Sequence, residues 1–367
     1  MRVAFAIENH LGHRALMSNM RTALAGRPDL DPVWIPIDAH GNGILDKTPI
    51  LKNKHALVLA VSARRALRLA EASGPLDVAF LHTQRMAHLL VGWMRRVPTF
   101  LSVDSTPAML KQYYVDSSEA SSRAQQGKPS AYSSLRDAVH RRTYRVACGV
   151  VCMSELVRDA VVGTYGVPRE RTLVLWPGVD VTRWCPPSER RPGAKVRLLF
   201  VGGEFERKGG LELLRWTRET SRTNWELDVV TEAKVEASNG VRVHSGFTPN
   251  DPRLIDLVQQ ADLFVLPTRA DMSPWVISEA KAAGKPVLST SVGALPEMVR
   301  HGIDGWLIPP RDHAALQSRL DQIVDEASSL PQFGERARHD AEQRFNAARN
   351  SEALLDFMNR FRSTRQA

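Results

Sequence analysis

The sequence predicts an α/β protein made of two Rossmann-like domains, each built on a doubly wound parallel sheet. Apolar runs of strand length alternate with amphipathic stretches of helical period, as in proteins with parallel sheets. The alternation stops once, in the proline-rich and charged segment Trp184–Lys195, and starts again at Val196. At 367 residues the chain also exceeds the size at which a single core usually stops growing. We therefore expect one domain over residues 1–186 and a second over residues 187–345.

The first predicted domain begins with the buried strand Arg2–Ile7, which has no polar residue after Arg2. Short apolar strands then recur, separated by helical patterns such as the amphipathic stretch Ser62–Ala72. The polar segment Val115–Ser133 has few groups to bury, so we expect a mobile loop there. The expected strands are Arg2–Ile7, Val33–Ile37, Asp77–His82, Thr99–Val103, Gly149–Met153 and Thr172–Leu175, and the expected helices are Leu16–Ala25, Ser62–Ala72, Arg85–Arg96, Ser134–Arg145 and Ser154–Thr164.

The second predicted domain repeats this architecture without an internal sequence repeat. After the strand that begins at Val196, the expected strands are Glu226–Val230, Val241–His244, Leu263–Leu266, Pro286–Ser289 and Gly305–Ile308. In open parallel sheets, ligands bind where the carboxyl ends of the strands meet. The two domains are therefore expected to place those ends along a central cleft.

Two segments of the second domain carry a strand, a glycine-rich turn and a helix start. They are LLFVGGEFERKGG, from Leu198, and TRADMSPWVISEAKAAGKPV, from Thr268. Glycine turns and helix N-termini expose backbone N–H groups that hold phosphate. Lys208 would add a cation for a diphosphate, and Glu279 an acceptor for sugar hydroxyls. Each feature alone also fits a plain turn, a surface lysine or a carboxylate in a first helical turn, so the hypothesis depends on their combination.

The order of these residues resembles the donor domain of the family-four retaining glycosyltransferases, which have the GT-B fold. The signature of that family is an acidic residue, seven others and then Glu, here Asp271 to Glu279. Lys208, with Arg207 beside it, matches the lysine of the family's Lys-Gly turn. The first half resembles the family more loosely, through Gly12-His13, LHTQ ending at Gln84, SVDSTP and the segment Ser154–Asp180. The resemblance also implies a C-terminal helix over residues 346–367 that crosses back to the N-terminal domain.

The resemblance implies transfer of a sugar from a nucleotide-diphosphate sugar to an acceptor hydroxyl, with retention at the anomeric carbon. Arg207 and Lys208 would stabilise the leaving diphosphate, Asp271 would hold the sugar ring, and Glu279 the ribose. His82, at a predicted strand end, resembles a family histidine near the reacting centre. The catalytic residues implied are Arg207, Lys208, Asp271 and His82, and the donor-binding residues are Gly202, Gly203, Ser273, Val276, Ile277 and Glu279.

Three departures from the family pattern concern the sugar and phosphate contacts. Asp271 replaces the usual Glu, Ser273-Pro274-Trp275 stands where Gly-Phe-Gly is common, and Gly203 replaces a phosphate-binding arginine of many members. Two alternatives therefore stay open. One is an inactive relative that binds a nucleotide sugar or serves as a scaffold, and the other is a nucleotide-sugar epimerase of the same fold.

No cofactor or metal ion is predicted. The Asp-x-Asp sequence Asp29-Leu30-Asp31 has the form of a metal-binding motif, but it follows a helix and does not end a buried strand. The three cysteines, Cys148, Cys152 and Cys185, lack metal-ligand spacing and are odd in number, so neither a zinc site nor a disulfide framework is expected.

The positive charge of the chain is confined to the first domain. Residues 1–186 hold 24 Lys and Arg against 15 Asp and Glu, whereas residues 187–367 hold 25 of each. Arg141, Arg142 and Arg145, with Arg95 and Arg96, form either a solvated face or a surface for anionic lipid or an acidic acceptor. No nucleic-acid-binding motif accompanies them, so nucleic acid is not an expected partner. Without a spanning segment or signal peptide, we expect a cytoplasmic protein, with peripheral contact at the inner face of the membrane as the alternative.

Overall fold

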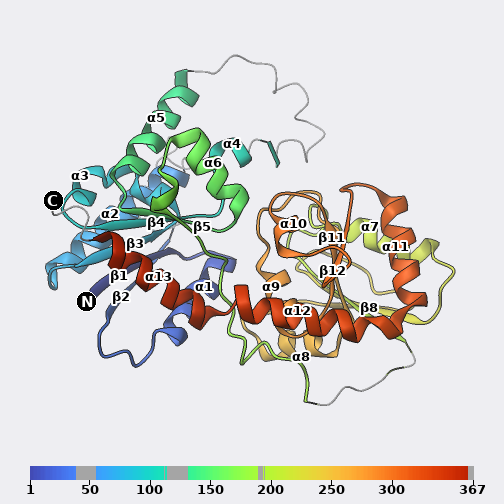
Figure 1. The fold of residues 1–367 in the computed structure, drawn as a ribbon. Coiled ribbons are helices and arrows are strands. Elements are labelled where there is room, and N and C mark those ends of the chain that lie inside the picture. Colours follow the sequence, from blue (N-terminus) through green and yellow to red (C-terminus); the bar gives the residue numbers. More distant parts are fainter. Residues whose placement is uncertain (39–54, 111, 114–130, 189–192, 194, 363–367) are drawn as a thin grey trace. The chain divides into compact units, whose positions relative to one another are not determined.

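The computed structural model describes residues 1–38, 55–110, 112–113, 131–188, 193 and 195–362. The expected mobile loop Val115–Ser133 lies outside the described residues except for its last three. The chain forms two compact units, each with one parallel sheet of six strands (Figure 1). Unit 1 comprises Met1–Pro107, Ala120–Trp176 and Ala348–Ala367, and unit 2 comprises Ala108–Glu119 and Pro177–Ala347.

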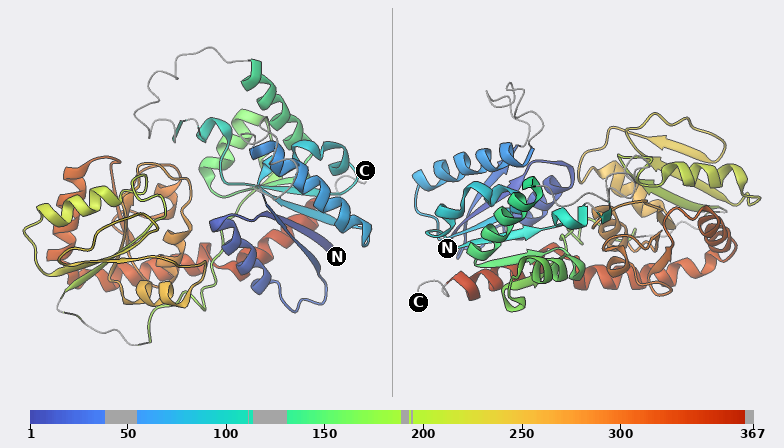
Figure 2. Two further views of the ribbon diagram at one scale, coloured as in Figure 1. Left: turned by 180° about the vertical axis from the view of Figure 1, so that it is seen from behind. Right: turned by 90° about the horizontal axis from the view of Figure 1, so that it is seen from above.

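The sheet of unit 1 has the strand order β2-β1-β3-β4-β5-β6. Every residue of β3, β4 and β5 is buried, which is typical of parallel strands covered on both faces. Helices do lie on both sides of this sheet (Figure 2). The strands are β1 (Arg2–Glu8), β2 (Asp31–Ile37), β3 (Val78–His82), β4 (Thr99–Val103), β5 (Gly149–Cys152) and β6 (Thr172–Val174), so all six predicted strands are confirmed.

The predicted helices of unit 1 are found, but two of them begin five and seven residues earlier than expected, at Leu11 and His55, and no single helix covers Arg85–Arg96. That segment is a 3₁₀ helix, η2 (Gln84–Leu89), followed by the single-turn α3 (Val91–Met94). The two are separated at Leu90, whose φ of −110° and ψ of 1° leave the helical region, so the prediction of one continuous helix was wrong. The other helices are α1 (Leu11–Ala23), α2 (His55–Ala72), α4 (Pro107–Leu110), α5 (Ala131–Val146), α6 (Glu155–Tyr165), η5 (Arg169–Arg171) and most of α13 (Ala347–Arg362).

The sheet of unit 2 has the strand order β12-β11-β10-β7-β8-β9. Its strands are β7 (Val196–Val201), β8 (Trp225–Val230), β9 (Val241–His244), β10 (Leu263–Leu266), β11 (Val287–Thr290) and β12 (Gly305–Ile308), again close to prediction. Its helices are α7 (Gly210–Glu219), α8 (Pro252–Gln260), α9 (Trp275–Ala282), α10 (Leu295–Met298), α11 (His313–Asp325), η6 (Ala327–Ser329) and α12 (Leu330–Arg344).

The strand order gives each unit one point where the chain reverses its direction across the sheet. In unit 2 the chain runs from β7 outward through β8 and β9, and then returns to pair β10 with the other side of β7. In unit 1 the same reversal lies between β1 and β3. The carboxyl ends of strands at such a switch point form a crevice that binds ligands in this class of sheet.

Candidate functional site

The loops that follow β7 and β10 are joined by hydrogen bonds at the switch point of unit 2. The carbonyl oxygen of Arg207 accepts from the Arg269 N–H at 2.8 Å and from the Thr268 hydroxyl at 3.2 Å. Gly209 has a φ of +86°, and a Cβ there would lie 2.1 Å from the Pro267 oxygen. Only glycine fits both the conformation and the contact. The two sequence motifs therefore meet in one surface.

The two predicted diphosphate cations lie on this surface and share one carboxylate. The Lys208 Nζ is 2.6 Å from the Asp271 Oδ2, and the Arg207 Nη1 is 3.6 Å from the same oxygen. Arg207 also donates to the Ala270 carbonyl and to both carboxylate oxygens of Glu204, at 2.8 and 2.6 Å. The side chains of Lys208, Arg207 and Asp271 are 16%, 19% and 10% exposed. Water screens these charges weakly at such low exposure.

The glycine pair after β7 brings backbone close to these cations. A Cβ on Gly202 would lie 2.9 Å from the Phe200 ring and 3.1 Å from the Lys208 Cβ. A Cβ on Gly203 would meet no heavy atom within 4 Å, so open space adjoins it. That space could receive a ligand.

The N-terminus of α9 opens on the loop that carries Asp271. No side chain caps it, and its N-cap residue is Pro274. The Ile277 N–H donates to the Pro274 oxygen at 3.1 Å, and the Ile277 side chain is fully buried. Ser273 and Val276 are partly exposed. The positive end of the helix dipole therefore faces this loop without a protein anion as its cap.

Glu279 is buried in α9, with 9% of its surface exposed. Burial raises the pKa of its carboxyl from 4.5 to about 7, because the charged form loses hydration. Among the described residues, none donates a hydrogen bond to this carboxylate or forms an ion pair with it. A buried acid held without a protein partner is typical of a functional group and costs stability when ionised.

A buried ion cluster that was not predicted from the sequence joins α9 to α12. Lys281 is fully buried, and its Nζ donates to the Met298 oxygen at 2.7 Å and to the Asp340 Oδ2 at 2.5 Å. The Asp304 Oδ2 lies 3.2 Å away. Because α12 carries Asp340, this ion cluster ties α9 to α12. In the sequence, only a lysine between two alanines signals it.

His82 lies in unit 1, at the carboxyl end of β3 and at that unit's switch point. Its Nδ1 is 2.9 Å from the Ser102 hydroxyl, and its buried Nε2 has no hydrogen-bond partner among the described residues. The His13 ring packs edge-on against it, with centroids 4.4 Å apart. Burial, with His13 and Arg85 nearby, holds the pKa of His82 well below its usual value. Its imidazole is therefore neutral near pH 7.

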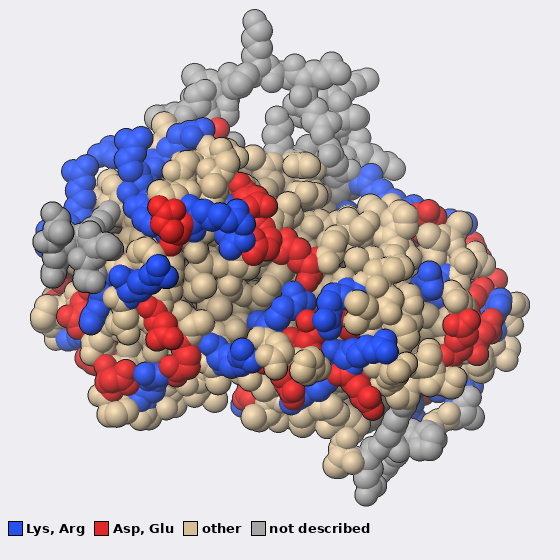
Figure 3. All heavy atoms as spheres, in the orientation of Figure 1, with Lys and Arg blue, Asp and Glu red and all other residues tan. Residues whose placement is uncertain are grey.

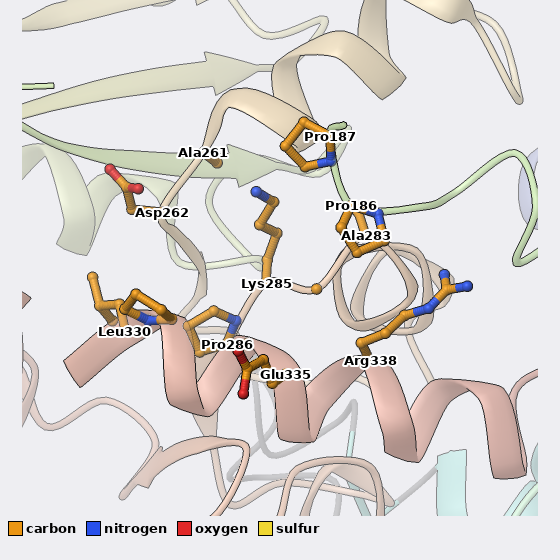
Figure 4. Close-up of a pocket in the computed structure, with 13 residues that line it drawn as sticks. Pro186, Pro187, Ala261, Asp262, Ala283, Lys285, Pro286, Leu330, Glu335 and Arg338 are labelled. Carbon is orange, nitrogen blue, oxygen red and sulfur yellow. The ribbon is translucent and has the colours of Figure 1, made fainter. Parts of the chain in front are cut away.

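A cavity of about 230 Å³ in unit 2 is lined by residues that precede β10 and β11 and by residues of α12 (Figure 4). Asp262 directly precedes β10, and Lys285 lies two residues before β11, whereas Lys208 and Asp271 follow the carboxyl ends of strands, so the cavity lies at the opposite end of the sheet. The cavity is also lined by Pro186, Pro187 and Arg338. It is separate from the predicted site.

No group of three or more His, Cys, Asp or Glu side chains in the described ranges could hold a metal ion. Asp29, of the Asp-x-Asp sequence, forms an ion pair with Arg27. None of the three cysteines, all of which the structure describes, forms a disulfide. Within the same residues, no helix combines the length and apolar character needed to cross a bilayer.

The two parallel-sheet units, with Lys208, Arg207 and Asp271 in the loops where β7 and β10 end, form a protein with the GT-B fold. Sucrose-phosphate synthase from Thermosynechococcus elongatus superposes with a TM-score of 0.77 at 17% identity, over 99% of this chain and 100% of that one. HepE of Anabaena, solved with UDP and glucose, gives a TM-score of 0.68 at 17% identity, over 98% and 99% of the two chains.

Family models cover most of the sequence. Residues 187–340 match glycosyl transferases group 1, and residues 24–183 match glycosyltransferase family 4. Together with the fold, the two matches support a group 1 glycosyltransferase of the GT-B type.

Relatives of known sequence agree with this family. A putative colanic acid biosynthesis glycosyltransferase of Escherichia coli is 30% identical over 200 residues, 49% of each chain, so this chain matches about half the length of that relative. The glycogen synthase of Mycobacterium tuberculosis is 25% identical over 302 residues, 77% of this chain and 68% of the relative.

Proposed function

We propose that this protein transfers a sugar from a nucleoside-diphosphate sugar to an acceptor hydroxyl in glycan biosynthesis, with retention at the anomeric carbon. One observation carries the proposal. Lys208 and Arg207 pair with Asp271, which lies in the loop that leads from β10 to the uncapped N-terminus of α9. This is a preorganised set of positive charges and dipoles of the kind that holds a diphosphate.

In this reaction, stabilisation of the leaving group contributes most to catalysis. Cleavage of the sugar–phosphate bond puts negative charge on the diphosphate, and Lys208 and Arg207 stabilise that charge from weakly screened positions. Glu279 accepts hydrogen bonds from the ribose hydroxyls, and Asp271 from the sugar ring. The leaving phosphate oxygen takes the acceptor's proton, so the protein supplies neither a nucleophile nor a metal ion. In the acceptor-binding domain, the neutral His82 offers its Nε2 as a hydrogen-bonding group.

UDP-sugars are the first donors to test, because HepE of Anabaena was solved with UDP and with UDP-glucose. Thermal shift with UDP, GDP, ADP and their sugars identifies the donor, since a ligand that binds only the folded state raises its stability. A stabilising nucleotide supports the proposal. If none of these compounds shifts the melting temperature or binds by calorimetry, the proposed donor site is wrong.

Glu279→Gln is expected to stabilise the empty protein at alkaline pH while weakening donor binding. The folded-state pKa of about 7 lies above the ordinary 4.5, so folding favours the protonated acid, and stability falls as pH rises from about 4.5 to about 7 and is level above that. At pH 8 the variant, which cannot ionise, should gain up to about 3 kcal/mol over the wild type in urea unfolding. Donor affinity should fall by about tenfold, because a charged hydrogen bond to ribose becomes a neutral one.

The matched control for Glu279→Gln is Glu236→Gln, an exposed change in the same unit. It should change neither the stability profile nor the affinity. Wild-type donor affinity should also rise as pH increases through about 7, when Glu279 ionises. A Glu279→Gln protein that binds donor normally at pH 8 would show that this carboxylate does not contact the ribose.

We also propose that unit 1 contacts anionic membranes through its arginines. Figure 3 shows Lys and Arg side chains gathered over α3 and α5. Arg95, Arg142 and Arg145 are exposed there. Arg96 is also exposed but lies 3.6 Å from Glu71, and Arg141 lies over the Tyr165 ring, so these two have protein partners as well. Each arginine near an anionic membrane surface contributes about 1 kcal/mol to the free energy of binding.

Replacing Arg95, Arg142 and Arg145 with glutamine should lower partitioning to anionic liposomes by about a hundred-fold in sedimentation assays. High salt should release the wild type, and neutral liposomes should not bind it. The control replaces the exposed Arg215, Arg218 and Arg336 of unit 2. If the wild type stays in the supernatant with anionic liposomes at low salt, the membrane proposal is wrong.

A further inference from the structure

The predicted sugar-binding carboxylate is bound to the predicted phosphate-binding cations. Asp271 accepts from Lys208 at 2.6 Å and lies 3.6 Å from the Arg207 guanidinium. A donor that places its diphosphate on Lys208 and Arg207 needs the position that this carboxylate occupies. Two anions held by the same cations in a weakly screened site repel each other, so they compete.

The two carboxylates near the cations differ in exposure. Glu204, which pairs with Arg207, is 69% exposed, so water screens it and its side chain can swing into solvent. Asp271 is 10% exposed and is the carboxylate that meets both cations. Most of the competition with an incoming diphosphate therefore comes from Asp271.

The backbone at Asp271 is fixed, which leaves its side chain as the movable part. The Ala294 N–H donates to the Met272 oxygen at 3.0 Å. Gly293 has a φ of +52° and lies so close to Asp271 that a Cβ at Gly293 would be 2.0 Å from the backbone carbonyl oxygen of Asp271. The Oδ1 of Asp271 accepts from the Met272 N–H at 3.0 Å. Rotation of the side chain alone can take Oδ2 away from Lys208.

We propose that Asp271 is an internal counter-ion that holds Lys208 and Arg207 in the empty site and is displaced from them by the donor's diphosphate. The displaced carboxylate is then free for the sugar ring. This inference rests on the proposed function and assigns a regulation to the same site. A free nucleoside diphosphate must also displace Asp271, but it has no sugar to form the new contact with this carboxylate. Asp271 therefore weakens binding of the released nucleotide more than binding of the intact donor.

Inorganic pyrophosphate, which has neither base nor sugar, is the probe that isolates the competition. Calorimetric titration at fixed ionic strength should show Asp271→Asn binding pyrophosphate about tenfold more tightly than the wild type, or about 1.4 kcal/mol. Asparagine keeps the acceptor for the Met272 N–H, so the loop should be retained, and thermal melting checks the fold. Adding Lys208→Ala to Asp271→Asn should abolish the gain.

The matched control is Glu206→Gln, which removes the same charge from the neighbouring loop, the one that carries Lys208 and Arg207. Glu206 is 68% exposed and pairs with Arg269, not with Lys208 or Arg207. The affinity of the Glu206→Gln protein for pyrophosphate should stay within about twofold of that of the wild type. An equal gain in Glu206→Gln would show a general charge effect and overturn the inference.

The remaining outcomes separate this inference from the proposed function. If the wild type binds a nucleoside diphosphate but Asp271→Asn shows no gain for pyrophosphate, the counter-ion role is wrong and the donor site stands. If neither the wild type nor Asp271→Asn binds pyrophosphate or any nucleoside diphosphate, the donor site itself is wrong, and the inference is overturned with it.

Discussion

Lys208→Ala is expected to lower sugar transfer by about a hundred-fold or more, the scale of losing one preorganised charge-stabilising donor. Lys208 is 16% exposed, so its charge acts on the leaving diphosphate with little screening. Because the interaction strengthens as the bond breaks, the loss should appear mainly in kcat. Steady-state kinetics with the donor identified by thermal shift measure it.

Lys195→Ala is the control for Lys208→Ala, because Lys195 is exposed in the same unit. It should leave kcat and KM unchanged. Removal of Lys208 also leaves Arg207, 3.6 Å away, as the cation beside the buried Asp271 among the described residues, so the melting temperature must be measured beside the kinetics. A folded Lys208→Ala protein with near wild-type kinetics would contradict the assigned site.

Asp271→Glu is expected to lower kcat/KM by about a hundred-fold with the native donor, although it restores the residue usual in the family. The added methylene moves the carboxylate by about 1.5 Å. The Asp271 Oδ2 already lies 2.6 Å from the Lys208 Nζ, and the loop backbone is held by Gly293, so the longer side chain must disturb one of these contacts. Kinetics with the native donor test this expectation.

The control for Asp271→Glu is Asp256→Glu, the same chemical change at an exposed position of unit 2. It should behave as the wild type. A pronounced gain with the native donor in Asp271→Glu would mean that the pocket has degenerated, and would favour an inactive relative that only binds nucleotide sugars.

The strands could be predicted because each is a short apolar run that must be buried on both faces of a parallel sheet. Leu263–Leu266 and Val241–His244 were predicted with the observed ends. The order of the strands could not be predicted from such runs, because apolar residues do not specify which neighbour they pair with. The prediction of one continuous helix over Arg85–Arg96 was wrong for a related reason. Its apolar residues fit a helix, but the break at Leu90 depends on packing.

The residues of the candidate site could be found from their motifs, but their contacts could not. Lys208 and Asp271 are 63 positions apart, and only the pairing of β7 with β10 brings their loops together. The raised pKa of Glu279 depends on burial by surrounding elements, which its position in a helix does not reveal. The same holds for the ion cluster around Lys281.

Release of nucleoside diphosphate from a nucleotide sugar in the absence of acceptor distinguishes a glycosyltransferase from a binding module. We expect slow hydrolysis of at least one donor by the wild type, and about a hundred-fold less by Lys208→Ala. Binding of a nucleotide sugar without turnover of any donor, with or without acceptor hydroxyls, would contradict sugar transfer and identify a binding module with the same fold.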